Sequence, residues 1–303
     1  MGETQTSALT VRGATKRYGD LLALAGVDLE VSRGEVFAFL GPNGAGKTTL
    51  VEILEGYRDR DDGEIRVLGV DPAHPTRSWR ERIGIVLQTS EIQPELTARE
   101  AVRLYAGYYP TPLPTDEVLR RVGLLAHGDR RVGKLSGGQK RRLDLALGIV
   151  GRPDVLFLDE PTTGFDPAAR REAWELVRSF RDLGTTIFLT THYMEEAEVL
   201  ADRVAIIVAG AIVAEGTIDE LSAGVGDTAL ITWRHAGRDP EPPPLSARVE
   251  RDGVKRRLES RDAVGDMERL IAWARDRGVG LEHIEIARPT LEDVYLRLTR
   301  EAS

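Results

Sequence analysis

The feature that most limits how this chain can fold is the stretch GPNGAGKT, which runs from Gly41 to Thr48 directly after the apolar run GEVFAFL. It fits the pattern G-x-x-x-x-G-K-[ST], in which glycines let the backbone curl so that several N–H groups point at one phosphate. A helix that begins at such a loop adds the positive end of its dipole. We therefore expect a buried strand before the loop and a helix from Thr48 to Gly56.

The same pattern predicts specific roles for Lys47 and Thr48 in binding a nucleotide. Lys47 is expected to reach the β- and γ-phosphates of a nucleotide, and the Thr48 hydroxyl to ligate Mg²⁺. The backbone around these two residues would cradle the phosphates. The predicted nucleotide-binding residues of the loop are Gly41, Pro42, Asn43, Gly44, Ala45, Gly46, Lys47, Thr48 and Thr49.

A second stretch, VLFLDE from Val155 to Glu160, supplies the acidic half of such a site. Its apolar residues predict a buried strand, and Asp159 emerges at the carboxyl end, where it can hold Mg²⁺ through water. Glu160 is the candidate general base for an attacking water; a surface salt bridge is its alternative role. The glycine loop and the acidic pair Asp159 and Glu160 together predict an enzyme that transfers a phosphoryl group to water.

The stretch KLSGGQKRR begins another helical pattern with a serine and two glycines. The Ser136 hydroxyl can donate, and the N–H groups of Gly137 and Gly138 can face a phosphate. A serine that merely caps an ordinary helix is the simpler interpretation. The chain thus carries two potential phosphate-binding helix starts, and one nucleotide needs only one of them.

Length and composition narrow the class of protein. The 303 residues are enough for roughly two domains. The net charge of −8 argues against nucleic acid as the main partner, because such binding rests on Lys and Arg. The absence of cysteine excludes disulfides, thiolate catalysis and cysteine-ligated zinc. The longest apolar run, 204–214, is too short for a membrane-spanning helix, so a partner would have to do any crossing.

Strands and helices are predicted to alternate along most of the chain. Two runs of alternating apolar and polar residues near the N-terminus predict antiparallel strands. The later alternation argues for a mostly parallel sheet covered by helices. We therefore expect an α/β fold over 8–225 with an antiparallel β subdomain and a helical insertion at about 97–151. A composition shift then predicts a small C-terminal α+β accessory domain over 226–303.

Five motifs occur in the order seen in ATP-binding-cassette (ABC) ATPases, which the chain resembles over 8–222. They are GPNGAGKTT, Gln88, LSGGQ, VLFLDEPTTGFDP and THYMEEAE. LSGGQ is the most specific of them, because other P-loop enzymes lack it. The chain most resembles ATPase subunits of drug-resistance exporters of the daunorubicin/doxorubicin type. The resemblance implies a P-loop NTPase that binds ATP and Mg²⁺ and drives a separate transmembrane permease for drug or antibiotic efflux.

The resemblance also explains the two helix starts. In such ATPases two subunits meet head to tail, and the LSGGQ of each closes on the γ-phosphate held by the loop of the other. Two ATP–Mg²⁺ complexes would hold the subunits together, and hydrolysis would let them part. This implies a homodimer in which the residues that face the opposite ATP are Ser136, Gly137, Gly138 and Gln139.

Other positions carry over by resemblance one at a time. Tyr18 resembles the aromatic residue that stacks on adenine, and Asp166 resembles the aspartate that contacts the opposite subunit. His192 resembles the histidine that reaches the γ-phosphate, and Gln88 the glutamine that senses Mg²⁺ and the attacking water. The implied catalytic residues are Glu160, His192, Gln88 and Lys47, and the implied metal ligands are Thr48, Gln88 and Asp159.

Two positions depart from the family pattern. Leu87 stands before Gln88 where many relatives have proline, which leaves the path of the next loop open. Phe165 stands where leucine is common, a packing change that should not alter the chemistry. Motion at Gln88 and the following TSEIQPELTARE is the expected route by which a membrane partner senses the nucleotide.

Other functions stay open at this point. The first alternative is an ABC ATPase that acts on nucleic acid or ribosomes; the acidic balance and the single unbroken cassette count against it. The second is the ATPase subunit of an importer. We expect the chain to be peripheral, on the cytoplasmic side of the cell membrane, with membrane contact only through the permease.

The last segment, RPTLEDVYLRLTRE, predicts an amphipathic helix. Four apolar side chains fall at helical spacing on one face, namely Leu291, Val294, Tyr295 and Leu298. They can form core packing within the accessory domain, or a docking face for a second subunit or for regulation. The sequence supports both interpretations.

Overall fold

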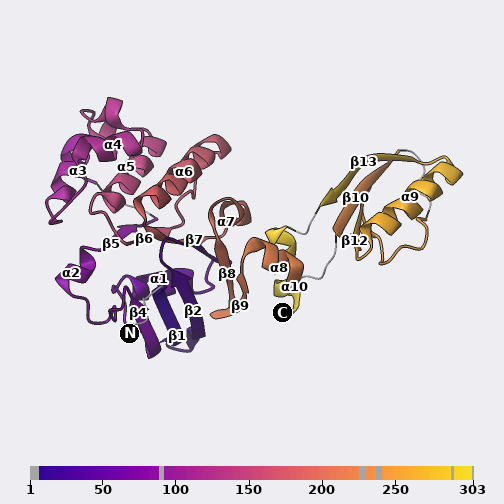
Figure 1. Ribbon diagram of the computed structural model, residues 1–303, viewed down its shortest axis with the longest axis horizontal. Coiled ribbons are helices and arrows are strands. Elements are labelled where there is room, and N and C mark those ends of the chain that lie inside the picture. The colour runs from indigo at the N-terminus through magenta and orange to yellow at the C-terminus, as the bar shows by residue number, and fades with distance from the viewer. Residues whose placement is uncertain (1–6, 89–91, 225–228, 237–240, 288–289, 302–303) are drawn as a thin grey trace, which may run out of the picture. The chain divides into compact units, whose positions relative to one another are not determined.

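The computed structural model describes residues 7–88, 92–224, 229–236, 241–287 and 290–301. It forms two compact units, Met1–Glu215 and Gly216–Ser303, which are described separately (Figure 1). The predicted domain boundary between 225 and 226 lies outside the described residues, so it stays a prediction. Residues 216–224 are counted with the second unit.

The first unit begins with a three-stranded antiparallel sheet in the order β2-β1-β4. The hairpin between β1 and β2 pairs Tyr18 with Leu21, and Gly19 in the turn has a φ of 57°, which glycine adopts without strain. The antiparallel subdomain is therefore confirmed. Its strands are β1 (Ser7–Tyr18), β2 (Leu21–Ser32) and β4 (Asp62–Val67).

A six-stranded sheet in the order β5-β6-β7-β3-β8-β9 forms the centre of the first unit. Its strands are β3 (Val36–Leu40), β5 (Ile83–Val86), β6 (Val155–Asp159), β7 (Thr186–Thr191), β8 (Arg203–Val208) and β9 (Ala211–Gly216). The ladders from β5 through β8 are parallel. Strand β7 pairs Thr191 with Leu40 of β3 and Thr190 with Asp159 of β6. The carboxyl ends of β3, β6 and β7 therefore meet at one edge, where parallel sheets bind ligands.

Aromatic side chains fill the core beneath this edge. Phe188 on β7 lies 5.7 Å from Phe37, 5.8 Å from Phe39 and 6.0 Å from Phe157 between ring centroids. All four rings are fully buried. This packing fixes the three central strands relative to one another, and with them the loops that follow the strands.

Helices α1, α5 and α7 contact strands of the central sheet, whereas α3 and α4 lie beyond α5 (Figure 1). Within the predicted helical insertion, α3, α4 and α5 contact one another, and the predicted capping box of Thr97 and Glu100 is present. Helix α2 was not predicted, and its Trp79 is buried with the indole N–H donating to the Val67 carbonyl. The helices are α1 (Lys47–Leu54), α2 (Arg77–Arg80), α3 (Ala98–Ala106), α4 (Thr115–Arg121), α5 (Gly137–Ile149), α6 (Pro167–Ser179) and α7 (Met194–Leu200), with 3-10 turns at Leu125–His127, Val132–Lys134 and Phe180–Leu183.

The second unit is an α+β assembly built on an antiparallel sheet in the order β11-β12-β10-β13. Helix α9 lies along this sheet (Figure 1), and Leu270 packs there with Trp233 and Leu258. Helix α10 packs against α8, where Leu291 and Val294 are buried, so that face contributes to packing within the unit. The elements are α8 (Ile218–Gly224), β10 (Ala229–Ala236), β11 (Glu250–Asp252), β12 (Lys255–Ser260), α9 (Ala263–Arg277), β13 (Gly280–Ala287) and α10 (Leu291–Glu301).

Candidate nucleotide site

The glycine loop lies between β3 and α1, as its pattern requires. Gly46, which caps α1, has a φ of 108°, and a Cβ there would lie 2.4 Å from the Ala23 carbonyl oxygen. A Cβ on Gly41 would lie 2.5 Å from the carbonyl oxygen of Ile207. No larger residue fits either position without a shift of backbone, so both glycines are needed for the loop to curl at this edge of the sheet.

Lys47 is folded back over the loop. It is 5% exposed, and its ammonium donates to the carbonyl oxygens of Gly41 (2.8 Å) and Pro42 (3.2 Å). The Glu160 carboxylate lies 3.6 Å from the same ammonium. Burial lowers the pKa of Lys47, and the neighbouring carboxylates of Glu160 and Asp159 act in the opposite direction. The Lys47 ammonium thus lies at the mouth of the glycine loop, between two backbone carbonyls and the Glu160 carboxylate.

Glu160 is the point where the predicted catalytic residues come together. Its side chain is 12% exposed and lies between Lys47 and His192, whose Nδ1 is 3.2 Å from Oε1. The other carboxylate oxygen accepts from Gln88 Nε2 at 3.3 Å and from the Thr163 hydroxyl at 3.1 Å. The structure thus brings Lys47, Gln88 and His192 around the Glu160 carboxylate, although the four residues come from four separate segments.

The backbone at Glu160 has a left-handed conformation that is uncommon for a residue with a side chain. Its φ is 44°, and its N–H donates to both the carbonyl and the hydroxyl oxygen of Thr190 on β7, each at 3.1 Å. Such a conformation persists only where the surroundings hold it in place. The bonds to β7 hold the carboxylate over the end of the sheet, toward the glycine loop.

The predicted metal ligands offer oxygen atoms of three kinds. Thr48 carries an exposed hydroxyl at the start of α1, Gln88 an amide and Asp159 a carboxylate that accepts from the Thr190 hydroxyl. An all-oxygen donor set suits Mg²⁺, which in nucleotide sites takes one or two protein carboxylates and completes its shell with phosphates and water. In keeping with this, the described part of the chain has no group of three or more His, Asp or Glu that could hold a metal by itself.

The second predicted phosphate site lies at the start of α5. Ser136 accepts from the Gln139 N–H at 3.3 Å, and Gln139 accepts from the Ser136 N–H at 3.0 Å, which makes a reciprocal cap. A Cβ on Gly137 or Gly138 would meet no atom within 4 Å, so this backbone is open. Ser136, Gly138, Gln139 and Asp166 line one hollow of about 500 Å³. No residue of the glycine loop lines that hollow.

Tyr18 and Asp166 lie where their predicted roles can be examined. Tyr18 ends β1 and is 38% exposed, with the Arg58 guanidinium 5.2 Å and the Lys16 ammonium 5.8 Å from its ring centroid. The Asp166 carboxylate caps α6 by accepting from the N–H groups of Ala168 and Ala169. The ring of Tyr18 is accessible to a base, and Asp166 also has a structural role.

Two buried charged residues near the site were not predicted. Glu196 on α7 is fully buried and accepts from the Thr162 hydroxyl and the Trp174 indole. Burial raises its pKa, against the opposing effect of these hydrogen bonds. Arg141 on α5 is 7% exposed and donates to backbone carbonyls beside Asp159. Glu196 lies within THYMEEAE and Arg141 lies two residues after LSGGQ, and charged residues in such stretches do not by themselves indicate burial.

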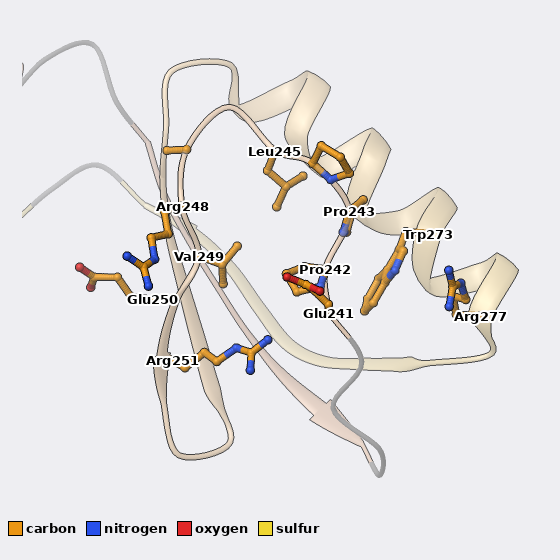
Figure 2. A pocket seen from close by; sticks show the side chains of 12 residues that line it. Glu241, Pro242, Pro243, Leu245, Arg248, Val249, Glu250, Arg251, Trp273 and Arg277 are labelled. Atoms are coloured by element: carbon orange, nitrogen blue, oxygen red, sulfur yellow. The ribbon is translucent and has the colours of Figure 1, made fainter.

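The second unit has a hollow of its own, of about 1410 Å³, next to strand β11 (Figure 2). Figure 2 shows Arg251 and Val249 of the strand segment on one side and Pro242 and Trp273 on the other. No predicted site residue lines it, and all its lining residues come from 241–277. The sequence indicated no chemistry there, and we assign none.

Comparison with known proteins decides the family. A model of the ABC transporter family matches residues 24–163. Daunorubicin resistance ATP-binding protein DrrA3 of Streptomyces coeruleorubidus is 44% identical, and the alignment covers 97% of this chain and 96% of that protein. The chain belongs to the ABC transporter ATP-binding proteins. Nod factor export ATP-binding protein I of Rhizobium etli is 38% identical over 97% of this chain and 93% of its own length.

Solved structures of ABC proteins agree. A structure of an ATP-binding subunit of an ABC transporter matches with a TM-score of 0.65 and 28% identity, over 72% of this chain and 93% of its own. CbiO1 of Clostridium perfringens, part of the ABC transporter complex cbiONQ, matches with a TM-score of 0.63 and 32% identity, over 72% and 91%. The predicted ABC ATPase fold is confirmed.

This ABC protein is an ATPase subunit of a transporter, as the resemblance implied. The relatives match it over almost its whole length, so the likeness includes the C-terminal unit. In the described part of the chain, no helix is long and apolar enough to cross a membrane. The family assignment places the crossing in a separate permease.

Proposed function

We propose that this ABC protein hydrolyses ATP with Mg²⁺ as the energy source of an exporter, and that two copies bind two ATP molecules at a head-to-tail interface. The drug-resistance and export names of its relatives support efflux of a drug or antibiotic as the transport task. The observation that carries the proposal is the convergence of Lys47, Gln88 and His192 on the Glu160 carboxylate beside the glycine loop.

The chemistry of the site follows from these contacts. Thr48, Asp159 and Gln88 would hold Mg²⁺, which when bound neutralises phosphate charge. Lys47, now bonded to the carbonyls of its own loop, would turn to the β- and γ-phosphates. Positioning and charge supply most of the catalysis of phosphoryl transfer.

Glu160 is the best-placed general base. Its carboxylate is mostly shielded from solvent and is held over the sheet edge by the backbone bonds to Thr190. Gln88 and Thr163 bond one oxygen of the carboxylate, and Lys47 and His192 flank the other. A water between this carboxylate and the γ-phosphate could give up its proton as it attacks. His192 would meet the γ-phosphate from the end of β7.

A second copy of the chain is the proposed partner of the hollow around Ser136. Gly137 and Gly138 start a helix of 13 residues, and a Cβ on either would meet no atom within 4 Å. The N–H groups of such an open helix start can bind an anion. The glycine loop of the same chain does not line that hollow. The loop of a second copy would supply the γ-phosphate, and Asp166 beside it would contact the opposite subunit.

Exposed tyrosines support a docking surface for the permease. Tyr57 after α1 is 71% exposed and Tyr108 after α3 is 65% exposed. The Tyr105 and Tyr108 rings pack edge to face at 6.1 Å. Clustered aromatic side chains in water mark protein contact surfaces. Residues 89–91 of the predicted signalling segment lie outside the described residues. We propose a peripheral position on the cytoplasmic side of the membrane, at the permease.

The proposal is tested by ATP-dependent assembly. Glu160→Gln, which should bind ATP without hydrolysing it, is expected to sediment as a dimer with ATP and Mg²⁺ and as a monomer with ADP. Adding Ser136→Arg should abolish the dimer, because a large cation fills the open helix start, while ATP binding persists. The control is Ser78→Arg, on the exposed face of α2. Persistent monomers of Glu160→Gln at saturating ATP would disprove the head-to-tail interface.

A further inference from the structure

Arg141 is a buried charge in the first turns of α5, close to the open helix start at Ser136. It is 7% exposed, whereas its neighbour Lys140 is exposed. Burying a guanidinium costs free energy unless hydrogen bonds and opposite charge compensate. The nearest described carboxylate is that of Asp144, 3.8 Å away on the same helix. The charges of Asp144, Asp159 and Glu196 favour the charged form of Arg141, and hydrogen bonds add to this compensation.

Those hydrogen bonds go to the backbone of the catalytic edge. The Arg141 guanidinium donates to the carbonyl oxygens of Leu87 (2.5 Å), Pro161 (2.9 Å) and Asp159 (3.3 Å). Leu87 directly precedes Gln88, and Asp159 and Pro161 flank Glu160 in the chain. One side chain is thus tied to both segments that carry the Gln88–Glu160 contact.

The next residue, Arg142, does not make these bonds, and a lysine in place of Arg141 would not replace them. Arg142 points elsewhere, to Glu172 on α6 and the Val122 carbonyl. A lysine at position 141 would present a single point charge, whereas the planar guanidinium spreads its donors over three acceptors. The bonds of Arg141 therefore connect α5 specifically with the residues around Gln88 and Glu160.

We propose that Arg141 is a positioning residue that couples the two nucleotide sites of the dimer. This inference rests on the proposed head-to-tail function. The start of α5 faces the ATP held by the second copy, while Gln88 and Glu160 serve the ATP held by their own chain. Because Arg141 connects α5 with the segments of Gln88 and Glu160, closure of α5 on one ATP would align Glu160 with the other ATP. Arg141 touches neither nucleotide itself.

The test separates coupling from stability and from binding. Arg141→Gln keeps a polar side chain but loses the charge and the planar array of N–H donors. Arg141→Lys keeps the charge on a compact ammonium that cannot span all three carbonyl oxygens. For each variant we would measure the melting temperature, the ATP dissociation constant of one site, kcat, and the Hill coefficient of ATP hydrolysis. Arg120→Gln, an exposed arginine on α4, is the matched control.

We expect the Hill coefficient of Arg141→Gln to fall from near 2 toward 1, since 2 is the ceiling for two sites. We expect kcat at saturating ATP to fall about tenfold, the effect of a base held in a less productive position. The single-site dissociation constant should stay within about twofold, because Arg141 makes no contact with that ATP. Arg141→Lys should recover kcat only in part, and Arg120→Gln should match the wild type.

A failure of the coupling role can be told apart from a failure of the proposed dimer. A folded Arg141→Gln with wild-type cooperativity would overturn the coupling role and leave the dimer intact. If Arg141→Gln does not fold, Arg141→Lys carries the test, and full cooperativity in it would be equally damaging. A wild-type Hill coefficient of 1 would overturn the two-site dimer, and the coupling with it.

Discussion

Two carboxylates, one in each unit of the molecule, are held in opposite ways. Asp266 in the second unit is fully buried and accepts from the Ser246 N–H, the hydroxyls of Ser246 and Ser260, and the Arg269 guanidinium. Glu160 in the first unit is 12% exposed and has a left-handed backbone, and its carboxylate accepts two side-chain hydrogen bonds longer than 3 Å. The first carboxylate is fully occupied, and the second has capacity left for a ligand.

A third carboxylate, also in the first unit, is buried without hydrogen bonds among the described residues. Glu55 at the end of α1 is 5% exposed, and neither of its oxygens has a hydrogen-bond partner among the described residues. Burial, followed by the nearby charges of Asp159 and Glu52, raises the pKa of Glu55 to about 8. The comparison teaches that hydrogen bonds hold the Asp266 charge as part of the structure, whereas Glu160 keeps capacity for a ligand and the raised pKa of Glu55 favours its protonated form.

The largest effect should come from removing the loosely held base. Glu160→Gln is expected to lower ATP turnover by about 10²–10⁴-fold, the usual contribution of a general base, with little change in ATP binding. Steady-state hydrolysis and nucleotide titration measure the two effects. Glu175→Gln, exposed on α6, should match the wild type. Near-normal turnover of Glu160→Gln would remove Glu160 from this role.

The opposite response is expected at the satisfied carboxylate. Asp266→Asn should destabilise the second unit by about 3 kcal/mol, because buried donors lose a charged acceptor. Hydrogen exchange should increase over α9 and β12, while ATP hydrolysis by the first unit persists. Asp276→Asn, exposed on the same helix, is the control. Loss of hydrolysis without loss of exchange protection would show that Asp266 serves the nucleotide site.

The stabilisation of the second unit by Asp266 depends on pH in a direction that follows from its pKa. Burial alone would raise the pKa of Asp266, but the hydrogen bonds from Ser246, Ser260 and Arg269 outweigh it and lower the pKa below its ordinary value. The stabilisation is present above the pKa of the unfolded chain and is lost as pH falls through the folded value. Asp266→Asn should therefore flatten the acid destabilisation of the second unit.

The smallest effect should come from Glu55, with the opposite sign in pH. Because its folded pKa is raised, its contribution is fully present below the pKa of the unfolded chain and is lost as pH rises toward 8. Glu55→Gln should therefore stabilise the first unit at pH 8 by on the order of 2 kcal/mol, and much less at pH 5. Melting curves at the two pH values measure this difference. The same gain at both values would contradict the assignment of a proton to Glu55.

The fold was largely predictable, because its signals are local. Alternation of apolar residues gave the strands, and Thr97 with Glu100 fixed the start of α3. Helix α2 was missed because four residues are too few to show a period, and Trp79 is buried by partners distant in the chain. The cap of α5 by Ser136 was foreseen, but the return bond from the Ser136 N–H to the Gln139 side chain was not, although S-x-x-Q is the ordinary sequence pattern of such a reciprocal cap.

The sequence by itself determined the chemistry available to this ABC protein. The glycine loop, the acidic pair and the second helix start are each written in consecutive residues, and backbone curl and helix dipole depend on such neighbours. Only the tertiary structure decided which of these groups meet. Gln88, Glu160 and His192 converge because β6 pairs with both β5 and β7, and Arg141 reaches Leu87 and Pro161 across that edge. Strand order and burial are long-range outcomes of packing, which motif spacing does not encode.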